Sequence, residues 1–374
     1  MRVPFFRSPW QEPGASERVM AAWGRVLGGG GYILGPSVQR FETALARRLG
    51  QGGVVGVNSG TDALVLALRL LNLEPGDEVV LPSYTFFACF EAVVRAGAVP
   101  VLCDCAADDF IAGAQQIAPC LTPRTRAVLA VPLFGAASAL PGIARLCRDR
   151  GLTLVEDAAQ ALGARAWSEE RGWVPAGAWG DLGTMSFYPT KTLGATGDAG
   201  ALHSPHPQLI DRARSLRNHG LLGALHADVG FNSRMDALQA EVLLIGLEQL
   251  DRWQARRQAI ARRYLAGLSG LPRIVLPQDR EGHAWNYFVL RSAHRDDLQA
   301  RLAAAGVDTK VYYERPIHQQ PAWLERFGER DLPIASSHAR QALALPIFPG
   351  MQEVEVEGVV AAVRQAVEEG QQNE

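Results

Sequence analysis

Lys191 carries the clearest chemical signal in this sequence. The chain has 37 basic side chains, and only Lys191 and Lys310 are lysines, so all the others are arginines. A primary amine can lose its proton and attack a carbonyl, whereas a guanidinium stays charged and cannot. Lys191 lies in a turn rich in Pro and Gly, between Pro189 and Gly194, and not on a charged helical face. We therefore expect Lys191 to act as an amine, whereas the neighbourhood of Lys310 assigns that residue no role.

Two other segments could hold a ligand for this amine. Gly60 and Thr61 lie where an apolar run meets a helical pattern, and the free N–H groups of a helix N-terminus favour an anion such as phosphate. On its own, this segment is better explained as an ordinary helix cap. Asp157 ends an apolar run, and open α/β sheets place ligands at the carboxyl ends of their strands. Its carboxylate could keep a heteroaromatic nitrogen protonated, and a strand-end cap or ion pair is an equal alternative.

The three features together match one cofactor. Pyridoxal phosphate requires a lysine for a Schiff base, a carboxylate for its pyridinium nitrogen and a site for its phosphate. The sequence contains no zinc-ligand set, no P-loop and no G-x-G-x-x-G string, so we expect no metal. A later polar stretch that contains Asn232 has, by its residue types alone, the character of a surface loop.

An alternation of apolar runs and helical patterns positions these residues. The expected strands are Val54–Val57, Glu78–Leu81, Val99–Cys103, Ala127–Val131 and Leu152–Glu156, and the expected helices between them include Thr61–Leu73, Thr85–Ala96 and Leu140–Arg150. This order predicts an α/β fold with a mainly parallel sheet and helices on both faces.

The pattern changes after about residue 240. A long helical pattern, Ala237–Tyr264, leads into a smaller region with expected strands at Tyr287–Leu290 and Lys310–Tyr313, a helix at Asp296–Ala305 and a closing helix at Glu353–Glu369. We therefore expect a large cofactor-binding domain over residues 1–245 and a small C-terminal α+β domain over residues 246–374.

Composition excludes several classes of partner. The net charge is −2 and the pI is about 6.5, so no basic field is available for nucleic acid or an anionic membrane. Prolines interrupt the N-terminal residues, which do not read as a signal peptide, and no segment approaches the length of a membrane span. The five cysteines are odd in number and lack Cys-x-x-Cys spacing, which favours reduced thiols in the cytoplasm.

The motifs also resemble those of a known family. The strings Tyr-Ile-Leu-Gly-Pro at 32–36, Pro-Ser-Tyr-Thr-Phe at 82–86 and Pro-Ile-His-Gln-Gln-Pro at 316–321, with Asp157 placed 34 residues before Lys191, resemble the DegT/DnrJ/EryC1/StrS sugar aminotransferases over almost the whole chain. The resemblance implies the fold-type-I architecture of pyridoxal phosphate transferases. In that fold, helices flank a mainly parallel seven-stranded sheet, and a smaller C-terminal α+β domain follows.

The resemblance implies a role for each matching residue. Lys191 would hold the cofactor and move the proton, Asp157 would hold the ring nitrogen, Gln160 would lie near the phenolic oxygen and Phe86 would stack on the ring. Gly60, Thr61 and Ser186 would hold the phosphate, and Asn232 would reach the phosphate in the neighbouring subunit of a homodimer with shared active sites. Tyr188, His318 and Tyr313 are the candidates for binding substrate.

The resemblance further implies a reaction. Glutamate would donate an amino group to a nucleotide-linked keto sugar, with pyridoxamine phosphate as the intermediate form of the cofactor. The product would be an amino sugar for secondary-metabolite or surface-glycan biosynthesis. The string from Ser186 to Gly200 looks most like those of 3-aminotransferases, which act on dTDP-3-keto-6-deoxyhexoses. The alternatives are a 4-keto or UDP-sugar aminotransferase and a catalytically idle regulatory or binding protein on the same scaffold. A dehydratase that uses the same cofactor is a further alternative, but those relatives have histidine in place of the lysine, so Lys191 argues against it.

Some positions depart from the family pattern. Residues 131–136 read Val-Pro-Leu-Phe-Gly-Ala where Val-His-Leu-Tyr-Gly-Gln is usual, and Thr192 and Tyr312 replace the usual asparagine and histidine. Residues 224–226 shorten a usual Arg-Tyr-His-His string. We expect these departures to affect the binding of sugar or nucleotide and not the cofactor chemistry.

Overall fold

The main sheet has seven strands and is mostly parallel. The computed structural model describes residues 2–12, 14–50 and 52–372. The strands, in spatial order, are β1 (Gly53–Val57), β9 (Gly200–Ser204), β8 (Leu182–Ser186), β5 (Thr153–Asp157), β4 (Thr125–Ala130), β2 (Glu78–Pro82) and β3 (Val99–Cys103). Only β9 runs antiparallel to its two neighbours, which confirms the predicted mainly parallel sheet.

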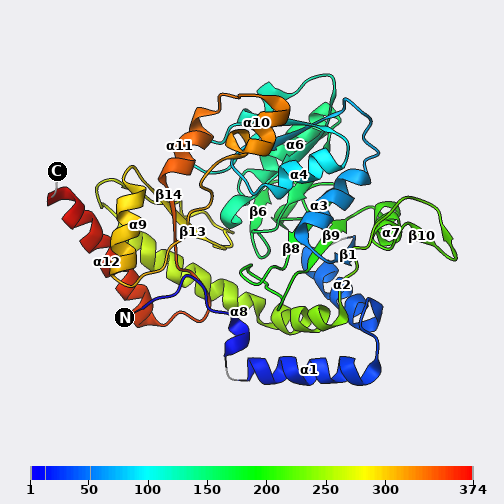
Figure 1. Cartoon of the computed structure of the whole chain (residues 1–374), viewed down its shortest axis with the longest axis horizontal. Helices are drawn as coiled ribbons and strands as arrows, with labels where there is room; N and C mark the ends of the chain where they lie inside the picture. The colour runs from blue at the N-terminus through cyan, green and yellow to red at the C-terminus, as the bar shows by residue number, and fades with distance from the viewer. Residues whose placement is uncertain (1, 13, 51, 373–374) are drawn as a thin grey trace.

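Helices cover both faces of this sheet (Figure 1). The helices of the chain are α1 (Ala15–Gly29), α2 (Gly35–Leu49), α3 (Gly60–Arg69), α4 (Ala88–Arg95), α5 (Ala114–Ile117), α6 (Leu140–Arg150), α7 (Pro207–Leu216), α8 (Ala237–Leu268), α9 (Arg295–Ala304), α10 (Pro321–Phe327), α11 (Pro333–Gln341) and α12 (Glu353–Gln372). The strand residues are buried on alternate sides, so Val55 belongs to one hydrophobic cluster and Val54 to another. Helices α3, α4 and α7 contribute to the first cluster, and α2, α6 and the first half of α8 contribute to the second.

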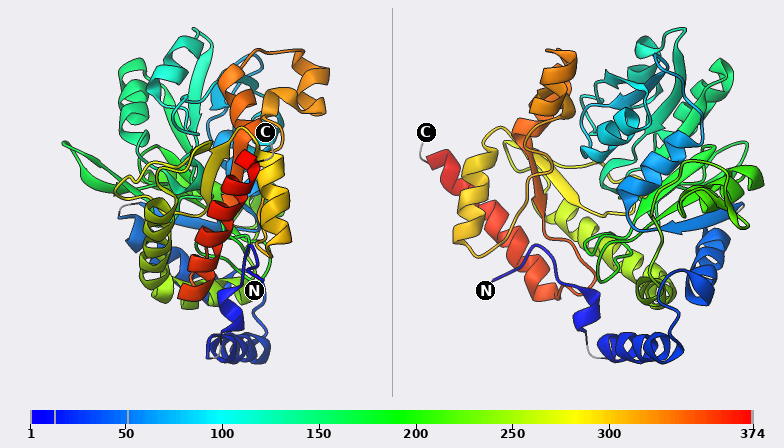
Figure 2. Two further views of the ribbon diagram at one scale, coloured as in Figure 1. Left: turned by 90° about the vertical axis from the view of Figure 1, so that its left-hand side faces the viewer. Right: turned by 45° about the vertical axis from the view of Figure 1, so that its right-hand side comes forward.

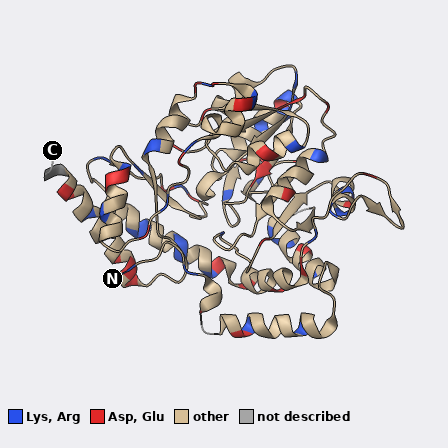
Figure 3. Ribbon diagram, in the orientation of Figure 1, with Lys and Arg blue, Asp and Glu red and all other residues tan. Residues whose placement is uncertain are grey.

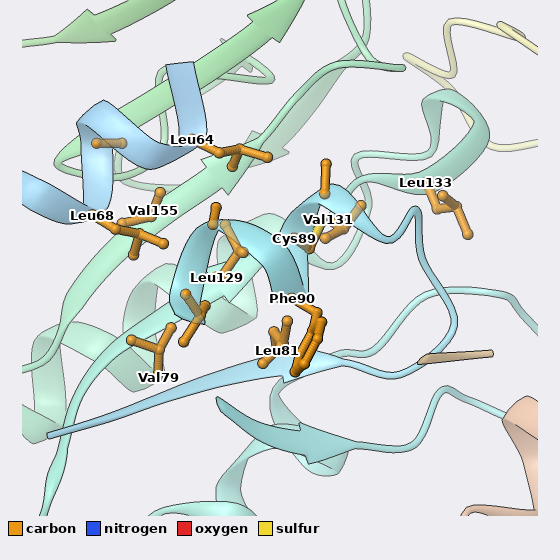
Figure 4. Close-up of a cluster of buried hydrophobic side chains, with 14 of the residues drawn as sticks. Leu64, Leu68, Val79, Leu81, Cys89, Phe90, Leu129, Val131, Leu133 and Val155 are labelled. Atoms are coloured by element: carbon orange, nitrogen blue, oxygen red, sulfur yellow. The ribbon is translucent and has the colours of Figure 1, made fainter. Parts of the chain in front are cut away.

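The first cluster anchors the helix that begins beside the predicted phosphate site. Leu64 and Leu68 of α3 and Phe90 of α4 pack over strand residues such as Leu129 and Val155 (Figure 4). Burial of each large apolar side chain contributes about 1.5–3 kcal/mol. The start of α3 is therefore held firmly against the sheet.

A second, smaller sheet forms beyond α8. It contains β12 (Ile274–Val275), β13 (Phe288–Ser292) and β14 (Ala342–Leu345), all antiparallel, and α9, α12 and the second half of α8 enclose a third cluster with it. Two hairpins complete the fold: β6 (Arg165–Ser168) with β7 (Gly172–Pro175), and β10 (Leu221–Leu222) with β11 (Leu225–His226).

Helix α8 joins the two sheets (Figure 2). Leu243 and Leu250 belong to the second cluster, whereas Ile260 and Tyr264 belong to the third. The division proposed at residues 245 and 246 therefore falls inside one continuous helix, and it stays a prediction. The N-terminal segment lies beside α12 and pairs with the second region, through a parallel bridge of Val3 with Val307.

Two predicted elements differ from the structure. The helix predicted from Thr85 begins at Ala88, which leaves Thr85 and Phe86 in the loop after β2. The predicted strand Lys310–Tyr313 is wrong, because only Lys310 makes a bridge, to Ala344. The hydroxyl of Tyr84 donates to Tyr312 O and accepts from Tyr313 N, so a side chain takes the place of a neighbouring strand.

Candidate active site

The predicted cofactor residues follow the carboxyl ends of strands that run in the same direction. Gly60 and Thr61 follow β1, Phe86 follows β2, Asp157 ends β5 with Gln160 just beyond it, and Ser186 ends β8 with Tyr188 and Lys191 in the loop that follows. Parallel strands end at one edge of their sheet, where open α/β folds place ligands. The fold thus brings together residues from positions 60 to 191.

A cavity of about 760 Å³ opens at this edge. The predicted residues that line it are Gly60, Thr61, Phe86, Asp157, Gln160, Ser186, Tyr188, Lys191 and Tyr313. A second cavity, of about 770 Å³, lies between α6 and the β6–β7 hairpin, and none of the predicted residues is among the described residues that line it. The chemistry predicted from the sequence therefore belongs to the first cavity.

Lys191 projects from a tight loop. The N–H of Lys191 donates to Tyr188 O at 2.9 Å, and Ala195 N donates to Phe187 O at 2.7 Å. A Cβ at position 194 would lie 2.3 Å from Pro189 O, so this close approach requires the glycine. Among the described residues, no side chain bonds to the ammonium of Lys191, which leaves its Nζ available to a ligand.

The start of α3 forms a cradle with the loop after β8. Ser59 caps the helix by accepting from Asp62 N at 3.1 Å, whereas the N–H groups of Gly60 and Thr61 have no acceptor among the described residues. A Cβ on Gly60 would lie 2.6 Å from Cβ of Ser186. The glycine therefore lets Ser186 approach two free N–H groups, and this arrangement suits a phosphate. The same helix start therefore has a side-chain cap at Ser59 and two N–H groups that are free for an anion, so the two alternatives are compatible.

Asp157 is buried and held at both carboxylate oxygens. Its Oδ1 accepts from Ala159 N at 3.1 Å, and its Oδ2 accepts from the thiol of Cys89 at 3.0 Å. Burial raises the pKa of Cys89 well above its ordinary value, and the charge of Asp157 raises it further, so the group is a thiol that donates. The carboxylate is fixed in orientation and faces the cavity.

Gln160 and Tyr313 form a second fixed pair on the cavity wall. Gln160 Oε1 accepts from Phe134 N at 2.9 Å, and Gln160 Nε2 donates to Tyr313 Oη at 2.9 Å. Burial raises the pKa of Tyr313 well above its ordinary value, so the phenol stays neutral. The amide of Gln160 thus presents a fixed donor to whatever lies in the cavity.

Two aromatic side chains are exposed toward the cavity. Phe86 is 53% exposed and Tyr188 is 52% exposed, although both lie beside well-packed loops. The ring of Phe86 lies 6.0 Å from that of Tyr313. An apolar face left open in this way is available for a flat ligand to stack on.

Two predicted residues do not line this cavity. The imidazole of His318 is buried between Ser83 Oγ at 2.6 Å and Ser336 Oγ at 3.0 Å, and burial lowers its pKa. Asn232 is exposed, and its Oδ1 accepts from Arg234 Nε at 3.0 Å. The substrate role of His318 stays a prediction that its position does not support. Asn232 is not among the described residues that line the cavity, and its role stays a prediction.

The departures from the family pattern fall in different places. Tyr312 lines the cavity, whereas Phe134 is buried behind Gln160, and Thr192 is buried and donates to Leu162 O at 2.9 Å. Of these three residues, Tyr312 alone is among the described residues that line the cavity.

Several residues that sequence reasoning passed over also line the cavity. They are Phe5 and Phe6 of the N-terminal segment, Thr85, Asp198, Tyr287, Asp308 and Lys310. Most carry no local signal, because contacts distant in sequence bring them to the cavity. Lys310 did carry one, namely its rarity in a chain of arginines.

These residues fit pyridoxal phosphate. Lys191 offers an unbonded amine, Asp157 a fixed carboxylate, Phe86 an open ring, and the cradle at Gly60 two free N–H groups. When bound there, the cofactor would be held by the lysine, with its ring nitrogen at the aspartate and its phosphate at the start of α3.

Comparisons with known proteins agree with this geometry. The chain is 42% identical over 373 residues to dTDP-3-amino-3,4,6-trideoxy-alpha-D-glucose transaminase of Streptomyces venezuelae, covering 98% of this chain and 97% of the relative. It superposes on the crystal structure of S. venezuelae DesV in complex with a ketimine intermediate with a TM-score of 0.93, at 42% identity, covering 98% and 99% of the two chains. It matches the structure of NtdA from Bacillus subtilis with bound cofactor PMP with a TM-score of 0.90, at 29% identity, over 98% of this chain and 85% of that one.

The family model gives the same result. It matches residues 14–364 and is described as the DegT/DnrJ/EryC1/StrS aminotransferase family. Family membership confirms the predicted fold-type-I architecture, the enzymatic role and pyridoxal phosphate as the cofactor. The chain belongs to the DegT/DnrJ/EryC1/StrS family of aminotransferases.

Proposed function

We propose that this enzyme transfers the amino group of glutamate to the 3-keto carbon of a dTDP-linked 6-deoxyhexose, giving an amino sugar for secondary-metabolite or surface-glycan biosynthesis. The observation that carries the proposal is the unbonded amine of Lys191 in a cavity that also presents Asp157 and Gln160. The substrate follows from the relative that is 42% identical over nearly the whole of both chains and is named for a dTDP-3-amino sugar.

Each fixed residue has one task in this reaction. The bound cofactor supplies a carbonyl for the amine and a ring that accepts electrons. Nζ of Lys191 holds the cofactor and, once displaced, carries a proton between the carbon atoms that react. Asp157 keeps a positive charge on the ring nitrogen, because its carboxylate is buried and fixed in place. Tyr188 lies on the wall with its ring exposed, where it can contact the sugar.

Absorption spectroscopy and single-turnover assays test this function. Purified protein should absorb visible light as a lysine-bound cofactor does, and glutamate should bleach that band. Lys191→Ala and Lys191→Arg should both abolish turnover, because the arginine variant restores the charge but not the nucleophile. Amination of dTDP-3-keto sugars should exceed that of dTDP-4-keto and UDP-3-keto sugars. A colourless protein that stays inert with added cofactor would overturn the proposal.

We further propose that the active enzyme is a homodimer with shared active sites. Tyr32 and Ile33 are each 49% exposed, and Leu222 and Leu225 of the β10–β11 hairpin are 68% and 74% exposed. Exposed apolar side chains of this size favour a partner surface. Asn232 follows this hairpin and lies outside the cavity of its own subunit. This position supports a role for Asn232 at the cofactor phosphate of the neighbouring subunit.

We place the enzyme in the cytoplasm, with no nucleic acid or membrane as a partner. All five cysteines are free thiols. Among the described residues, no helix combines the length and apolar character that a membrane span needs. The positions of basic and acidic residues are interleaved along the ribbon (Figure 3).

A further inference from the structure

Both lysines of the chain line the same cavity. Lys191 and Lys310 are 119 positions apart in a sequence with only these two lysines, and both contribute to the wall of the 760 Å³ cavity. No arginine is among the described residues that line it, although arginine supplies every other basic side chain. Because we assign Lys191 to the cofactor, Lys310 is the other basic Lys or Arg side chain that the described lining residues offer to a substrate.

The ammonium of Lys310 is free while its backbone is fixed. Lys310 N donates to Ala344 O at 3.2 Å, and Ala344 N donates to Lys310 O at 2.8 Å, so the residue is anchored to β14. No hydrogen bond or ion pair of the described residues engages its side chain. The nearest acid in sequence on the same wall, Asp308, lies 3.7 Å from Arg2 Nη2. A free ammonium on an anchored backbone is ready to pair with an anion.

Lys310 stands on the opposite structural unit from Lys191. It belongs to the segment beside β14, together with Tyr312, whereas Lys191 follows β8 of the main sheet. The N-terminal residue Phe5 lines the same wall, and its ring lies 6.0 Å from that of Tyr312 and 6.1 Å from that of Tyr287. This wall includes the aromatic side chains of Phe5, Tyr287 and Tyr312 together with Lys310. Lys310 is exposed, whereas the three aromatic residues are partly or fully buried.

We propose that Lys310 binds the diphosphate of the nucleotide sugar and so selects nucleotide-linked substrates. The inference rests on the proposed function, because it assumes that the substrate carries a diphosphate. A lysine ammonium binds phosphate as a compact point charge. Lys310 is exposed and lines the same cavity as the cofactor residues, so it is open to a part of the substrate that extends away from the reacting carbon.

Substrate geometry favours the diphosphate over the α-carboxylate of the amino donor. In either half-reaction the reacting carbon must reach Nζ of Lys191. The α-carboxylate of glutamate is attached directly to that carbon and stays near the cofactor, whereas the diphosphate is several bonds away from the keto carbon of a sugar. The exposed lysine of the cavity wall, Lys310, therefore matches the group that lies several bonds from the reacting carbon.

The test measures binding and the two half-reactions separately on the holoenzyme. Titration calorimetry with dTDP and with UDP gives the Kd of each nucleotide for wild type, Lys310→Gln, Lys310→Arg and a control, Arg47→Gln. Arg47 is exposed in the last turn of α2 and makes no ion pair among the described residues, so this control removes an equal charge away from the cavity. Bleaching of the cofactor band by glutamate reports the donor half-reaction.

We expect Lys310→Gln to raise the Kd of the tighter-binding nucleotide about tenfold, which corresponds to about 1.4 kcal/mol. Lys310→Arg should recover most of the affinity, and Arg47→Gln should change the Kd less than twofold. Glutamate should bleach the Lys310→Gln enzyme at a concentration within about twofold of wild type.

Three results would contradict the proposal. They are an unchanged nucleotide Kd in Lys310→Gln, wild-type enzyme that binds neither nucleotide, and a variant in which the glutamate requirement alone rises. In each case an intact cofactor band that bleaches with glutamate would leave the proposed aminotransferase function standing, so the two failures are distinguishable.

Discussion

The thiol of Cys89 donates to Asp157 Oδ2 over 3.0 Å, and this contact joins the first helix turn after β2 to the last residue of β5. Cys89 is fully buried, and Thr85 Oγ1 lies 3.4 Å from its sulfur. The Asp157 carboxylate, which faces the cavity, is thus held by a short chain of polar groups. Cys89 is not among the described residues that line the cavity, so we expect it to act by positioning Asp157.

Replacing Cys89 should weaken the interaction of the Asp157 carboxylate with the ring nitrogen of the cofactor. Cys89→Ala removes one donor from a buried carboxylate, and the loss of a hydrogen bond to a charged group costs about 1.5–3 kcal/mol, less for a weak thiol donor. We expect kcat to fall about tenfold and the pH profile of the cofactor absorption band to shift. Cys89→Ser restores a donor, and its kcat and absorption profile should return toward wild type.

This expectation separates positioning from simple packing. If Cys89→Ser and Cys89→Ala were impaired equally, with unchanged absorption profiles, the hydrogen bond would have no part in holding the ring.

The phosphate cradle should fail when Gly60 gains a methyl group. A Cβ there would lie 2.6 Å from Cβ of Ser186, so one wall of the cradle must move. Overpacking of this kind costs about 1–3 kcal/mol. We expect Gly60→Ala to raise the Kd of pyridoxal phosphate about tenfold or more, measured by titrating the apoenzyme with cofactor.

Gly24 provides the matched control for this variant. It lies in α1, and nothing stands within 4 Å of the position that its Cβ would occupy. Gly24→Ala should leave the Kd unchanged. Equal cofactor affinity in the two alanine variants would show that the cradle tolerates the added methyl group.

The sequence was most informative where the signal is local. The buried strand β5 appeared as a mainly apolar stretch just before Asp157, predicted over Leu152–Glu156, and the loop of Lys191 appeared as a cluster of Pro and Gly. Contacts between segments that are distant in sequence have no such local pattern. Lys310 reaches the cavity because Ala344 anchors its backbone, and Cys89 matters because the first turn of α4 brings its thiol to the carboxylate at the end of β5. The strand expected at 310–313 fails for the same reason, since the hydroxyl of Tyr84 binds the backbone that a strand would have paired.

Mixed dimers test the shared active site. If Lys191 of one subunit works with Asn232 of the partner subunit, a heterodimer of Lys191→Ala and Asn232→Ala contains one site with both changes and one with neither. Random reassociation of equal amounts should recover about a quarter of wild-type turnover, because half of the dimers are mixed and each holds one intact site.

The parent variants are the controls for this mixing. Lys191→Ala alone should be inactive, and Asn232→Ala alone should bind cofactor more weakly. A mixture whose turnover equals the average of the two separate variants would place Asn232 and Lys191 in the same subunit, or Asn232 outside the site.

Acid should destabilise the protein through buried His283. Its Nδ1 accepts from Trp285 N at 2.9 Å, its ring stacks on Trp285 at 3.9 Å, and burial lowers its pKa to about 3, with a smaller contribution from Arg280. In the unfolded chain the imidazole of His283 binds a proton below about pH 6.5, whereas in the folded protein it binds one only below about pH 3. Its contribution to stability is therefore complete above pH 6.5 and is lost as the pH falls toward 3, by up to about 1.4 kcal/mol per pH unit.

His283→Asn keeps an acceptor near Nδ1 without the titration. The free energy of unfolding is measured with denaturant at pH 7.5, 6.5, 5.5 and 4.5. Above pH 6.5 the difference in this free energy between wild type and variant should be constant, and below pH 6.5 the free energy of unfolding should fall less steeply for the variant. Because His338, whose pKa burial lowers to about 4, is present in both proteins, the difference between them isolates His283. If the plots of unfolding free energy against pH stayed parallel for the two proteins down to pH 4.5, the folded protein would be binding a proton at His283 as readily as the unfolded chain does.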